Sequence, residues 1–142
     1  NNFTRTINIW FKKTFGRNPK IAILGLNPHN AEFKNGSEEK RIIIPSIKFL
    51  KNLKIDVKGP FVSDTFFIKN YKNFDIIVGM YHDQVLTPFK ALYNFEAVNF
   101  TLGLDYLRAS PDHGVAVDLI GKNKADFKSL YKCINFINKF NK

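Results

Sequence analysis

The sequence predicts an α/β protein of the three-layer α/β/α type with a largely parallel sheet. Three observations predict this fold class. Continuous apolar runs of strand length occur at Ile21–Leu26, Asp75–Met80 and Ala97–Leu102, as is typical of strands buried on both faces. Segments with helical periodicity alternate with these runs. Each run is followed by a polar, turn-rich segment, which is where open α/β sheets place their ligand sites.

The first predicted element is a helix at Thr6–Phe15, whose apolar face is Ile7, Ile9, Trp10 and Phe11. A buried strand is predicted next, at Ile21–Leu26, because five of its six residues are apolar. It leads directly into Asn-Pro-His, so a histidine is expected at the end of a buried strand.

A second helix is predicted to begin at Ser37. A serine N-cap followed by Glu38 and Glu39 stabilises the first turn, because carboxylates favour the positive end of the helix dipole. We expect Pro45 to kink this helix, because proline removes one backbone hydrogen bond. The Gly59-Pro60 pair predicts an interruption of regular secondary structure.

The later elements follow the same rules. The β-branched residues Ile76–Val78 support the strand at Asp75–Met80, and a further strand is predicted at Ala97–Leu102. A short strand is predicted at Tyr106–Ala109. The last element is a helix at Asp126–Phe140, with Leu130, Ile134 and Ile137 on one face.

Composition narrows the class of protein. The 142 residues, of which 44% are hydrophobic, suit one globular domain with a real core. Cys133 is the only cysteine, so an internal disulfide and a thiolate zinc cluster are excluded. We expect a cytoplasmic protein with no membrane partner, since there is neither a long apolar run nor a signal-like segment.

The net charge of +10 has three interpretations. It suits a nucleic-acid-binding module, an anionic small substrate, or a solvated basic surface. The lysines are scattered, which favours the solvated surface. The 15% aromatic content keeps the nucleic-acid alternative open. Against it, no glycine-flanked aromatic motif and no basic recognition helix are present, and we expect no nucleic-acid partner.

All three histidines of the chain follow apolar runs, at His29, His82 and His113. Asp83 directly follows the second and Asp112 directly precedes the third. Imidazole with a nearby carboxylate suits a divalent metal such as zinc, manganese or magnesium, and a carboxylate can also orient a ligating imidazole. The alternative is that the histidines are structural and that the two aspartates are helix caps.

Three further residues lie near the same strand ends. Lys90 and Arg108 are cations that suit a phosphate or carboxylate group, the arginine in bidentate fashion. Each could equally be a surface cation. Asn99 lies inside an apolar strand, so we expect a buried amide that either satisfies the structure or contacts a substrate.

Five ordered segments carry a resemblance to a known family: LNPHNAE, GPFVSDTFF, the run from Phe74 to Gln84 that ends in MYHDQ, AVNFTLGL, and LRASPDHGVAVDLIGK. From Ile21 onward the chain resembles the 4-hydroxythreonine-4-phosphate dehydrogenases of pyridoxal phosphate (vitamin B6) biosynthesis. The resemblance implies an isocitrate and isopropylmalate dehydrogenase-like fold, a cytoplasmic homodimer, and NAD with zinc, magnesium or cobalt as cofactors. It also implies oxidation of 4-phosphohydroxy-L-threonine, a small phosphorylated amino acid, and its decarboxylation to 3-amino-2-oxopropyl phosphate.

The resemblance also implies roles for single residues. The matched metal ligands are His29 and His82, and the matched substrate residues are Lys90, Asn99 and Arg108. The segment HGVAVDLIGK is similar to the cofactor loop HGSAPDIAGK of the isopropylmalate dehydrogenases, which implies NAD contacts for His113, Gly114 and Asp118. The general base stays open between Lys90, Asp83 and Asp64.

The chain departs from the family pattern in several places. The family's LNPHAGE reads LNPHNAE here, followed by a loop that is one residue shorter, and its HDQG reads HDQV. Val85 would be awkward if that position required a positive φ. The family has a longer N-terminal region, which holds a third metal histidine, so we expect this chain to be a C-terminal portion that is inactive alone.

The expected domain organisation follows from this resemblance. Residues 1–104 are expected to form a metal- and substrate-binding α/β domain, and residues 105–142 to pack on the missing N-terminal domain. A catalytically dead homologue that serves as a scaffold is the remaining alternative.

Overall fold

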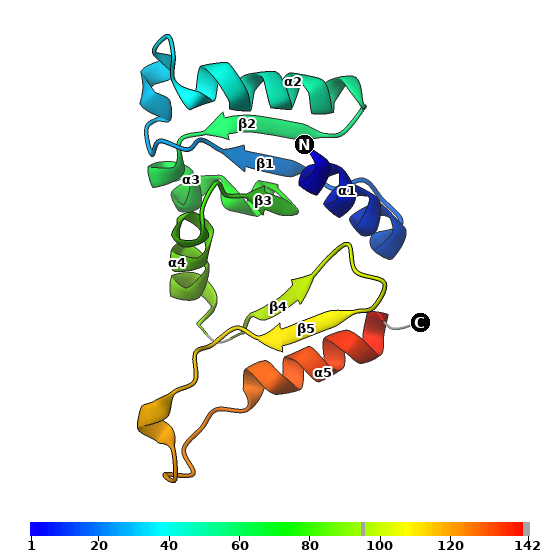
Figure 1. Cartoon of the computed structure of the whole chain (residues 1–142), viewed down its shortest axis with the longest axis vertical. Helices are drawn as coiled ribbons and strands as arrows, with labels where there is room; N and C mark the ends of the chain where they lie inside the picture. The colour runs from blue at the N-terminus through cyan, green and yellow to red at the C-terminus, as the bar shows by residue number, and fades with distance from the viewer. Residues whose placement is uncertain (95, 141–142) are drawn as a thin grey trace. The chain divides into compact units, whose positions relative to one another are not determined.

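The computed structural model describes residues 1–94 and 96–140. The chain divides into two compact units, Asn1–Pro88 and Phe89–Lys142, called unit 1 and unit 2 below. Figure 1 shows the order of their helices and strands. In the described part of the chain, no helix has the length and apolar character needed to cross a membrane.

Unit 1 is built around a parallel sheet of β1 (Ile21–Leu24), β2 (Val57–Phe61) and β3 (Ile76–Val78). Its strand order is β2-β1-β3, and β1 pairs in parallel with both neighbours. All four residues of β1 are buried. The prediction of an α/β fold with a parallel sheet is confirmed in this unit.

Helices cover both faces of this sheet (Figure 1). They are α1 (Asn2–Phe15), α2 (Ile44–Asn52), α3 (Ser63–Lys69) and the start of α4 (His82–Tyr93). Ile21 and Ile23 of β1 pack with Ile47 and other residues of the α2 side. Ala22 and Leu24 pack with the fully buried Phe66 of α3. The alternation of β1 side chains therefore produces three layers.

Two expectations about proline are corrected by the structure. Gly59 and Pro60 do not interrupt regular secondary structure, because both lie inside β2. β2 is an edge strand of its sheet, where the missing N–H of a proline is tolerated. The helix that begins after Ser37 is interrupted before Pro45 by a π-helical turn at Glu39–Ile43. Pro45 itself is the second residue of α2, so the irregular backbone lies in the turn before the proline.

Val85 occupies a position that needs no positive φ. It lies within α4 and is not among the residues with left-handed backbone. It packs on the buried side of the helix against the cluster that contains Phe66. A Cβ at Gly79 would lie 2.6 Å from Val85 Cγ1, so the small residue at 79 makes room for the larger one at 85.

Unit 2 is a β-hairpin covered by a helix. The strands β4 (Val98–Thr101) and β5 (Arg108–Pro111) pair in antiparallel fashion, and α5 (Lys128–Phe140) packs on them. The predicted strand at 97–102 is therefore present. It pairs with the strand that follows it and belongs to a separate two-stranded sheet, not to the parallel sheet of unit 1.

The buried face of α5 differs from the predicted one. Ser129 and Cys133 are buried, and the Phe136 ring stacks on Phe100 of β4 with centroids 4.9 Å apart. Leu130 and Ile134, which the sequence placed on the apolar face, are 51% and 49% exposed. Together with Tyr131, and with Phe127 directly before the helix, they form an exposed stripe, called the exposed stripe of α5 below.

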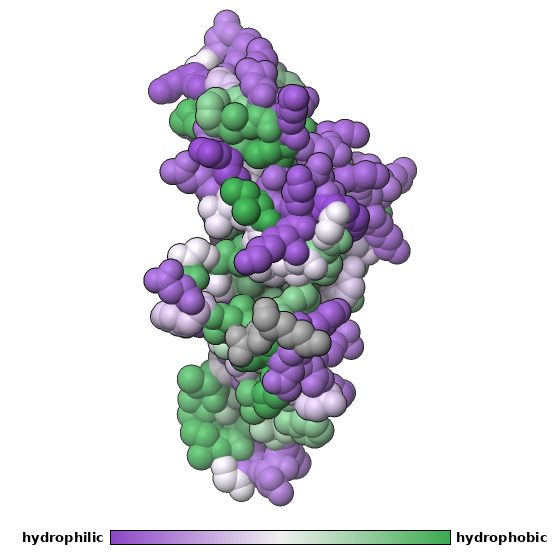
Figure 2. Space-filling view, turned by 90° about the vertical axis from the view of Figure 1, so that its right-hand side faces the viewer, coloured by the Kyte–Doolittle hydropathy of each residue, from purple (hydrophilic) through white to green (hydrophobic). Residues whose placement is uncertain are grey.

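Further apolar residues of unit 2 are exposed in the segment that connects β5 to α5. Val115, Val117 and Ile120 are 88%, 66% and 74% exposed. Figure 2 shows hydrophobic residues gathered at the lower end of the molecule, where this segment lies. Single exposed apolar residues are common in proteins, but a group of this size marks an interaction surface.

Candidate active site at the carboxyl edge of the parallel sheet

Three of the predicted site residues emerge from neighbouring strands of unit 1. His29 lies in the loop after β1, Asp64 lies in the first turn of α3 after β2, and His82 is the first residue of α4 after β3. The strands are parallel and adjacent, so their carboxyl ends meet at the same edge of the sheet. The structure therefore brings these side chains to one edge, as the sequence predicted for the two histidines.

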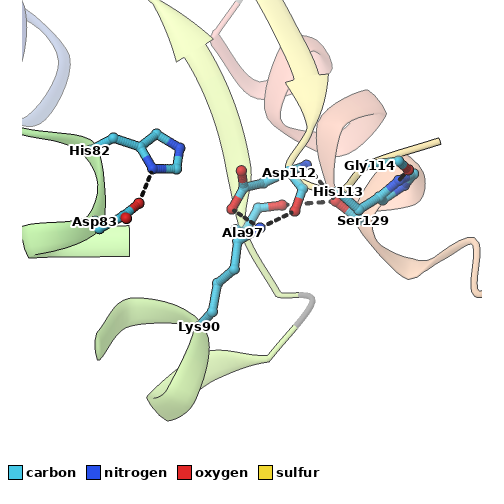
Figure 3. A network of polar contacts seen from close by, with 8 residues as sticks. All are labelled: His82, Asp83, Lys90, Ala97, Asp112, His113, Gly114 and Ser129. Carbon is cyan, nitrogen blue, oxygen red and sulfur yellow. Dashed lines mark hydrogen bonds and ion pairs between the residues drawn. The ribbon is translucent and has the colours of Figure 1, made fainter. Parts of the chain in front are cut away.

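Each of the two histidines is paired with a carboxylate. His29 Nε2 lies 3.0 Å from Asp64 Oδ2, and His82 Nδ1 lies 2.6 Å from Asp83 Oδ1 (Figure 3). The histidine side chains are 70% and 77% exposed, so a ligand can reach them. A carboxylate on one ring nitrogen fixes the ring orientation and leaves the other nitrogen for a ligand.

A depression of about 380 Å³ lies in unit 1 beside the carboxylates of both pairs. Its wall includes Pro28, Asp64, Tyr81, Asp83 and Gln84. Pro28 immediately precedes His29, and the two aspartates are the partners of the two histidines. The carboxylate partner of each histidine thus lines the depression, whereas neither imidazole does.

The donor chemistry of these residues fits a divalent cation only in part. Imidazole and carboxylate are the ligands that such ions use in proteins. However, residues 1–94 and 96–140 bring no three histidine, cysteine, aspartate or glutamate side chains together in metal-binding geometry.

The loop that carries His29 has an unusual backbone. Asn30, Ala31, Glu32 and Phe33 all have positive φ, between 46° and 56°. Non-glycine residues rarely adopt this conformation, and each costs on the order of 1 kcal/mol unless its surroundings hold it. Asn27 Oδ1 helps to hold the turn by accepting hydrogen bonds from the backbone N–H groups of His29 and Ala31, at 2.9 and 3.1 Å.

The predicted substrate residues Asn99 and Arg108 lie in unit 2, on one face of the β4–β5 hairpin. Thr101 pairs with Arg108 and Asn99 with Ser110, so these four side chains share a face. The guanidinium of Arg108 donates a hydrogen bond of 3.1 Å to Thr101 Oγ1. The expectation that Asn99 is buried is wrong, because its face of the hairpin points away from α5 and the residue is exposed.

Lys90 of α4 is fixed by the segment that follows β5. Its Nζ donates a hydrogen bond of 3.1 Å to the Asp112 carbonyl and lies 3.6 Å from Asp112 Oδ2 (Figure 3). The Asp112 carboxylate is 16% exposed, and the Lys90 side chain is 44% exposed. The backbone of the same segment is held by the buried Ser129, whose Oγ accepts from the Asp112 N–H and donates to the Ala97 carbonyl.

The predicted cofactor residues also lie in unit 2. His113 and Gly114 line a cavity of about 510 Å³, together with Leu119. His113 Nδ1 lies 2.9 Å from the Gly114 carbonyl. Asp118 lies next to Leu119 in a short 3₁₀ helix, Val117–Leu119. Because His113 belongs to unit 2, only His29 and His82 are grouped within unit 1.

Sequence reasoning missed three buried polar residues around the strand ends of unit 1. Asn30, Glu39 and Gln84 are 1%, 0% and 7% exposed. Asn30 and Gln84 stand in the very motifs that carry His29 and His82, yet nothing in their type distinguishes them from surface residues. Glu39 was expected at an exposed helix start. Only the fold shows that these side chains point inward.

The fold and the site define a class: an α/β protein with imidazole–carboxylate pairs at the carboxyl edge of a parallel sheet. Comparison with known proteins identifies the family. The family model described as "Pyridoxal phosphate biosynthetic protein PdxA" matches residues 1–137. A curated relative named 4-hydroxythreonine-4-phosphate dehydrogenase, from Sulfurihydrogenibium sp., is 51% identical over 132 residues, covering 92% of this chain and 41% of the relative.

Solved structures agree with this assignment. The 4-hydroxythreonine-4-phosphate dehydrogenase of Klebsiella pneumoniae superposes with a TM-score of 0.78 at 34% identity, over 93% of this chain and 40% of that one. A terephthalate 1,2-cis-dihydrodiol dehydrogenase of Burkholderia xenovorans superposes with a TM-score of 0.71 at 25% identity, over 96% of this chain and 44% of that one. The chain belongs to the PdxA family, as the motifs predicted. It spans about two fifths of the length of the curated relatives it matches.

Proposed function

We propose that the protein containing this chain is an NAD-dependent dehydrogenase of pyridoxal phosphate biosynthesis. It would oxidise the secondary alcohol of 4-phosphohydroxy-L-threonine and release carbon dioxide to give 3-amino-2-oxopropyl phosphate. The observation that carries the proposal is the pair of imidazole–carboxylate contacts, His29–Asp64 and His82–Asp83, at one sheet edge in a chain of this family.

His29 and His82 would hold a divalent cation, either zinc, magnesium or cobalt. Such a cation supplies Lewis-acid polarisation of the substrate hydroxyl. Asp64 and Asp83 would orient the two imidazoles through the contacts described above. The remaining ligands would come from outside this chain.

Lys90, Asn99 and Arg108 would bind the polar and anionic groups of the substrate. Arg108 and Asn99 present their side chains on one face of the hairpin. Lys90 donates to the Asp112 carbonyl beside the Asp112 carboxylate, and these contacts hold its ammonium group in place. Asp64, Asp83 and Lys90 remain the candidates for the group that accepts the alcohol proton.

The cavity of unit 2 that His113 and Gly114 line would receive part of NAD. Its volume of about 510 Å³ falls within the range of small-molecule sites. Asp118, in the neighbouring 3₁₀ helix, would accept hydrogen bonds from ribose hydroxyls, as the similar loop of the isopropylmalate dehydrogenases implies.

Residues 105–142 would pack on the N-terminal region of the longer relatives, and the protein would act as a homodimer. The exposed stripe of α5 and the exposed valines and isoleucine before it support this arrangement. It follows that this chain alone would be inactive.

The test is NADH formation. The intact protein encoded by the complete reading frame would be mixed with NAD, 4-phosphohydroxy-L-threonine and Co²⁺, Mg²⁺ or Zn²⁺ in turn, beside the 142-residue chain. We expect NADH from the intact protein and none from the chain. Parallel reactions of His82→Asn should lose most activity, whereas Lys139→Ala, an exposed change on α5, should keep it. A folded intact protein that forms no NADH with any of the metals would contradict the proposal.

A further inference from the structure

Gln84 is the one side chain, among the described residues, for which the structure records hydrogen bonds to both histidine-bearing strand ends. Its Nε2 donates a hydrogen bond of 2.6 Å to the Gly25 carbonyl, and its Oε1 accepts one of 2.7 Å from the Met80 N–H. Gly25 follows β1 and Met80 follows β3. The amide therefore bridges the chain just before His29 to the chain just before His82.

We propose that Gln84 is a positioning residue that fixes the two histidines relative to each other. This proposal rests on the proposed function, in which the two imidazoles are ligands of one metal ion. Gln84 itself touches neither the metal nor the substrate. It acts through the backbone of two loops, and its side chain is 7% exposed, so water cannot replace its hydrogen bonds at low cost.

The surroundings of Gly25 explain why this bridge is specific. A Cβ at Gly25 would collide with Asn30 Oδ1, so the buried Asn30 side chain lies directly against the Gly25 backbone. Asn30 Nδ2 in turn donates a hydrogen bond of 3.1 Å to the Pro60 carbonyl at the end of β2. The His29 loop is thus tied to β2 through Asn30 and to β3 through Gln84.

A second buried side chain holds the start of the same loop. Glu39 is fully buried, and its Oε1 accepts a hydrogen bond of 2.8 Å from the Asn27 N–H. Asn27 caps the left-handed turn that follows His29. Left-handed backbone at four successive non-glycine residues persists only where the structure around it is over-determined, and such places are concentrated at functional sites.

A purely structural role for Gln84 makes a different prediction from a positioning role. If Gln84 only stabilised unit 1, its loss would weaken the unit as a whole. If it positions the histidines, its loss would loosen two loops and weaken metal binding beyond the effect of a matched loss of stability. Asp75→Asn is the control that lowers stability to a similar extent. Asp75 lies at the amino end of β3, opposite to the end that carries His82.

The experiment uses the intact protein and two readouts. The first is Co²⁺ affinity, with the visible spectrum of the bound ion as a report on its ligands. We expect Gln84→Met to lower the affinity by about tenfold, the lower end of what outer-shell changes cause, and to alter the spectrum. Asp75→Asn should leave both unchanged at a similar loss of melting temperature. Wild-type affinity in Gln84→Met would overturn the proposal.

The second readout is amide hydrogen exchange, which does not depend on metal. Gln84→Met should speed exchange in residues 25–33 and 79–83 and leave α2 unchanged. Gln84→Glu separates the two hydrogen bonds: its carboxylate still accepts from Met80 but cannot donate to Gly25, so residues 25–33 should loosen more than residues 79–83. Faster exchange throughout unit 1 in either variant would overturn the proposal. A wild-type protein that binds no Co²⁺ would contradict the proposed metal site, while the exchange pattern would still decide the role of Gln84.

Discussion

Ala31 is a small residue in a backbone conformation that suits glycine. Its φ is 46°, and the family motif LNPHAGE has glycine at this position. Ala31→Gly should raise the free energy of unfolding of the chain by up to about 1 kcal/mol, because glycine adopts the left-handed region without steric cost. Chemical denaturation of the 142-residue chain measures this change.

The control for Ala31→Gly is the same substitution in regular helix. Ala91 lies in α4, where glycine should lower stability by about 1 kcal/mol. The two alanines should therefore respond with opposite sign. Destabilisation at both positions would show that the left-handed turn carries no strain.

Asp75 makes the stability of the chain depend on pH. The Arg17 guanidinium donates two hydrogen bonds to its carboxylate, at 2.6 and 2.9 Å, and these lower the pKa of Asp75 from 3.8 to about 2. The folded pKa lies below the unfolded one, so the ionised carboxylate stabilises the fold above pH 3.8, and this contribution is lost as the pH falls towards 2.

Asp75→Asn should accordingly lower the melting temperature near neutral pH, and the difference from the wild type should shrink as the pH falls from 3.8 and be largely lost below about pH 2. Melting curves of both proteins across this pH range measure it. The Lys20 N–H, which donates to Asp75 Oδ2 at 2.8 Å, keeps an acceptor in the variant, whereas one of the two hydrogen bonds from Arg17 is lost together with the charge. A gap that persists in full at the acid end would refute this account.

At the scale of elements, Phe66 is the buried residue through which α3 packs on the sheet. Phe66 is 1% exposed, and its ring lies 5.1 Å from that of Phe61 and 5.8 Å from that of Phe74. Phe66→Ala should cost roughly 3–5 kcal/mol of unfolding free energy, because it removes buried apolar area and leaves a cavity.

Ile68 on the same helix serves as the comparison for Phe66. It is 69% exposed, so Ile68→Ala should change stability by no more than about 0.5 kcal/mol. Denaturant titration of both variants tests the pair. Equal losses at the two positions would mean that α3 does not pack as described.

Much of unit 1 could be predicted because its signals are local. The unbroken apolar run of β1 reports burial on both faces, and the parallel sheet then places His29 and His82 at one edge without further information. β2 was missed because Gly59 and Pro60 normally end strands, and only its edge position makes them acceptable. The inward direction of the Gln84 side chain was also missed, because the burial of a polar side chain depends on tertiary packing.

In unit 2, the helix and the strand were predicted from the sequence, but the contacts between them were not. The strand at 97–102 was predicted correctly. An apolar run, however, does not indicate which other strand it will pair with. Its antiparallel partner β5 leaves Asn99 on the exposed face, against expectation. The helix α5 was also predicted, yet its buried face contains Ser129 and Cys133, whose small side chains gave no apolar signal.

At the scale of the whole molecule, the proposed packing of residues 105–142 on an N-terminal region predicts that a change in the exposed stripe of α5 acts differently in the chain and in the intact protein. Ile134 is 49% exposed in the chain, so Ile134→Asp should leave the melting temperature of the chain nearly unchanged. In the intact protein the same change should lower the melting temperature by about 5 °C or more, because a charge would replace a buried apolar contact.

The comparison for Ile134→Asp is Asn138→Asp, which introduces the same charge at an exposed polar position of α5. It should be tolerated by both forms. Thermal unfolding of the four proteins gives the answer. If Ile134→Asp is as harmless in the intact protein as in the chain, residues 105–142 do not pack on the N-terminal region through this stripe.

The division into two units also separates two natural reporters. The only tryptophan, Trp10, lies in α1 of unit 1, 5.9 Å from the ring of Phe15. The only cysteine, Cys133, is buried in α5 of unit 2, and burial raises the pKa of its thiol. The fluorescence of Trp10 therefore reports the unfolding of unit 1, and the rate of Cys133 alkylation reports the unfolding of unit 2. Unmodified protein is enough to learn whether the two units unfold in a single transition or one after the other.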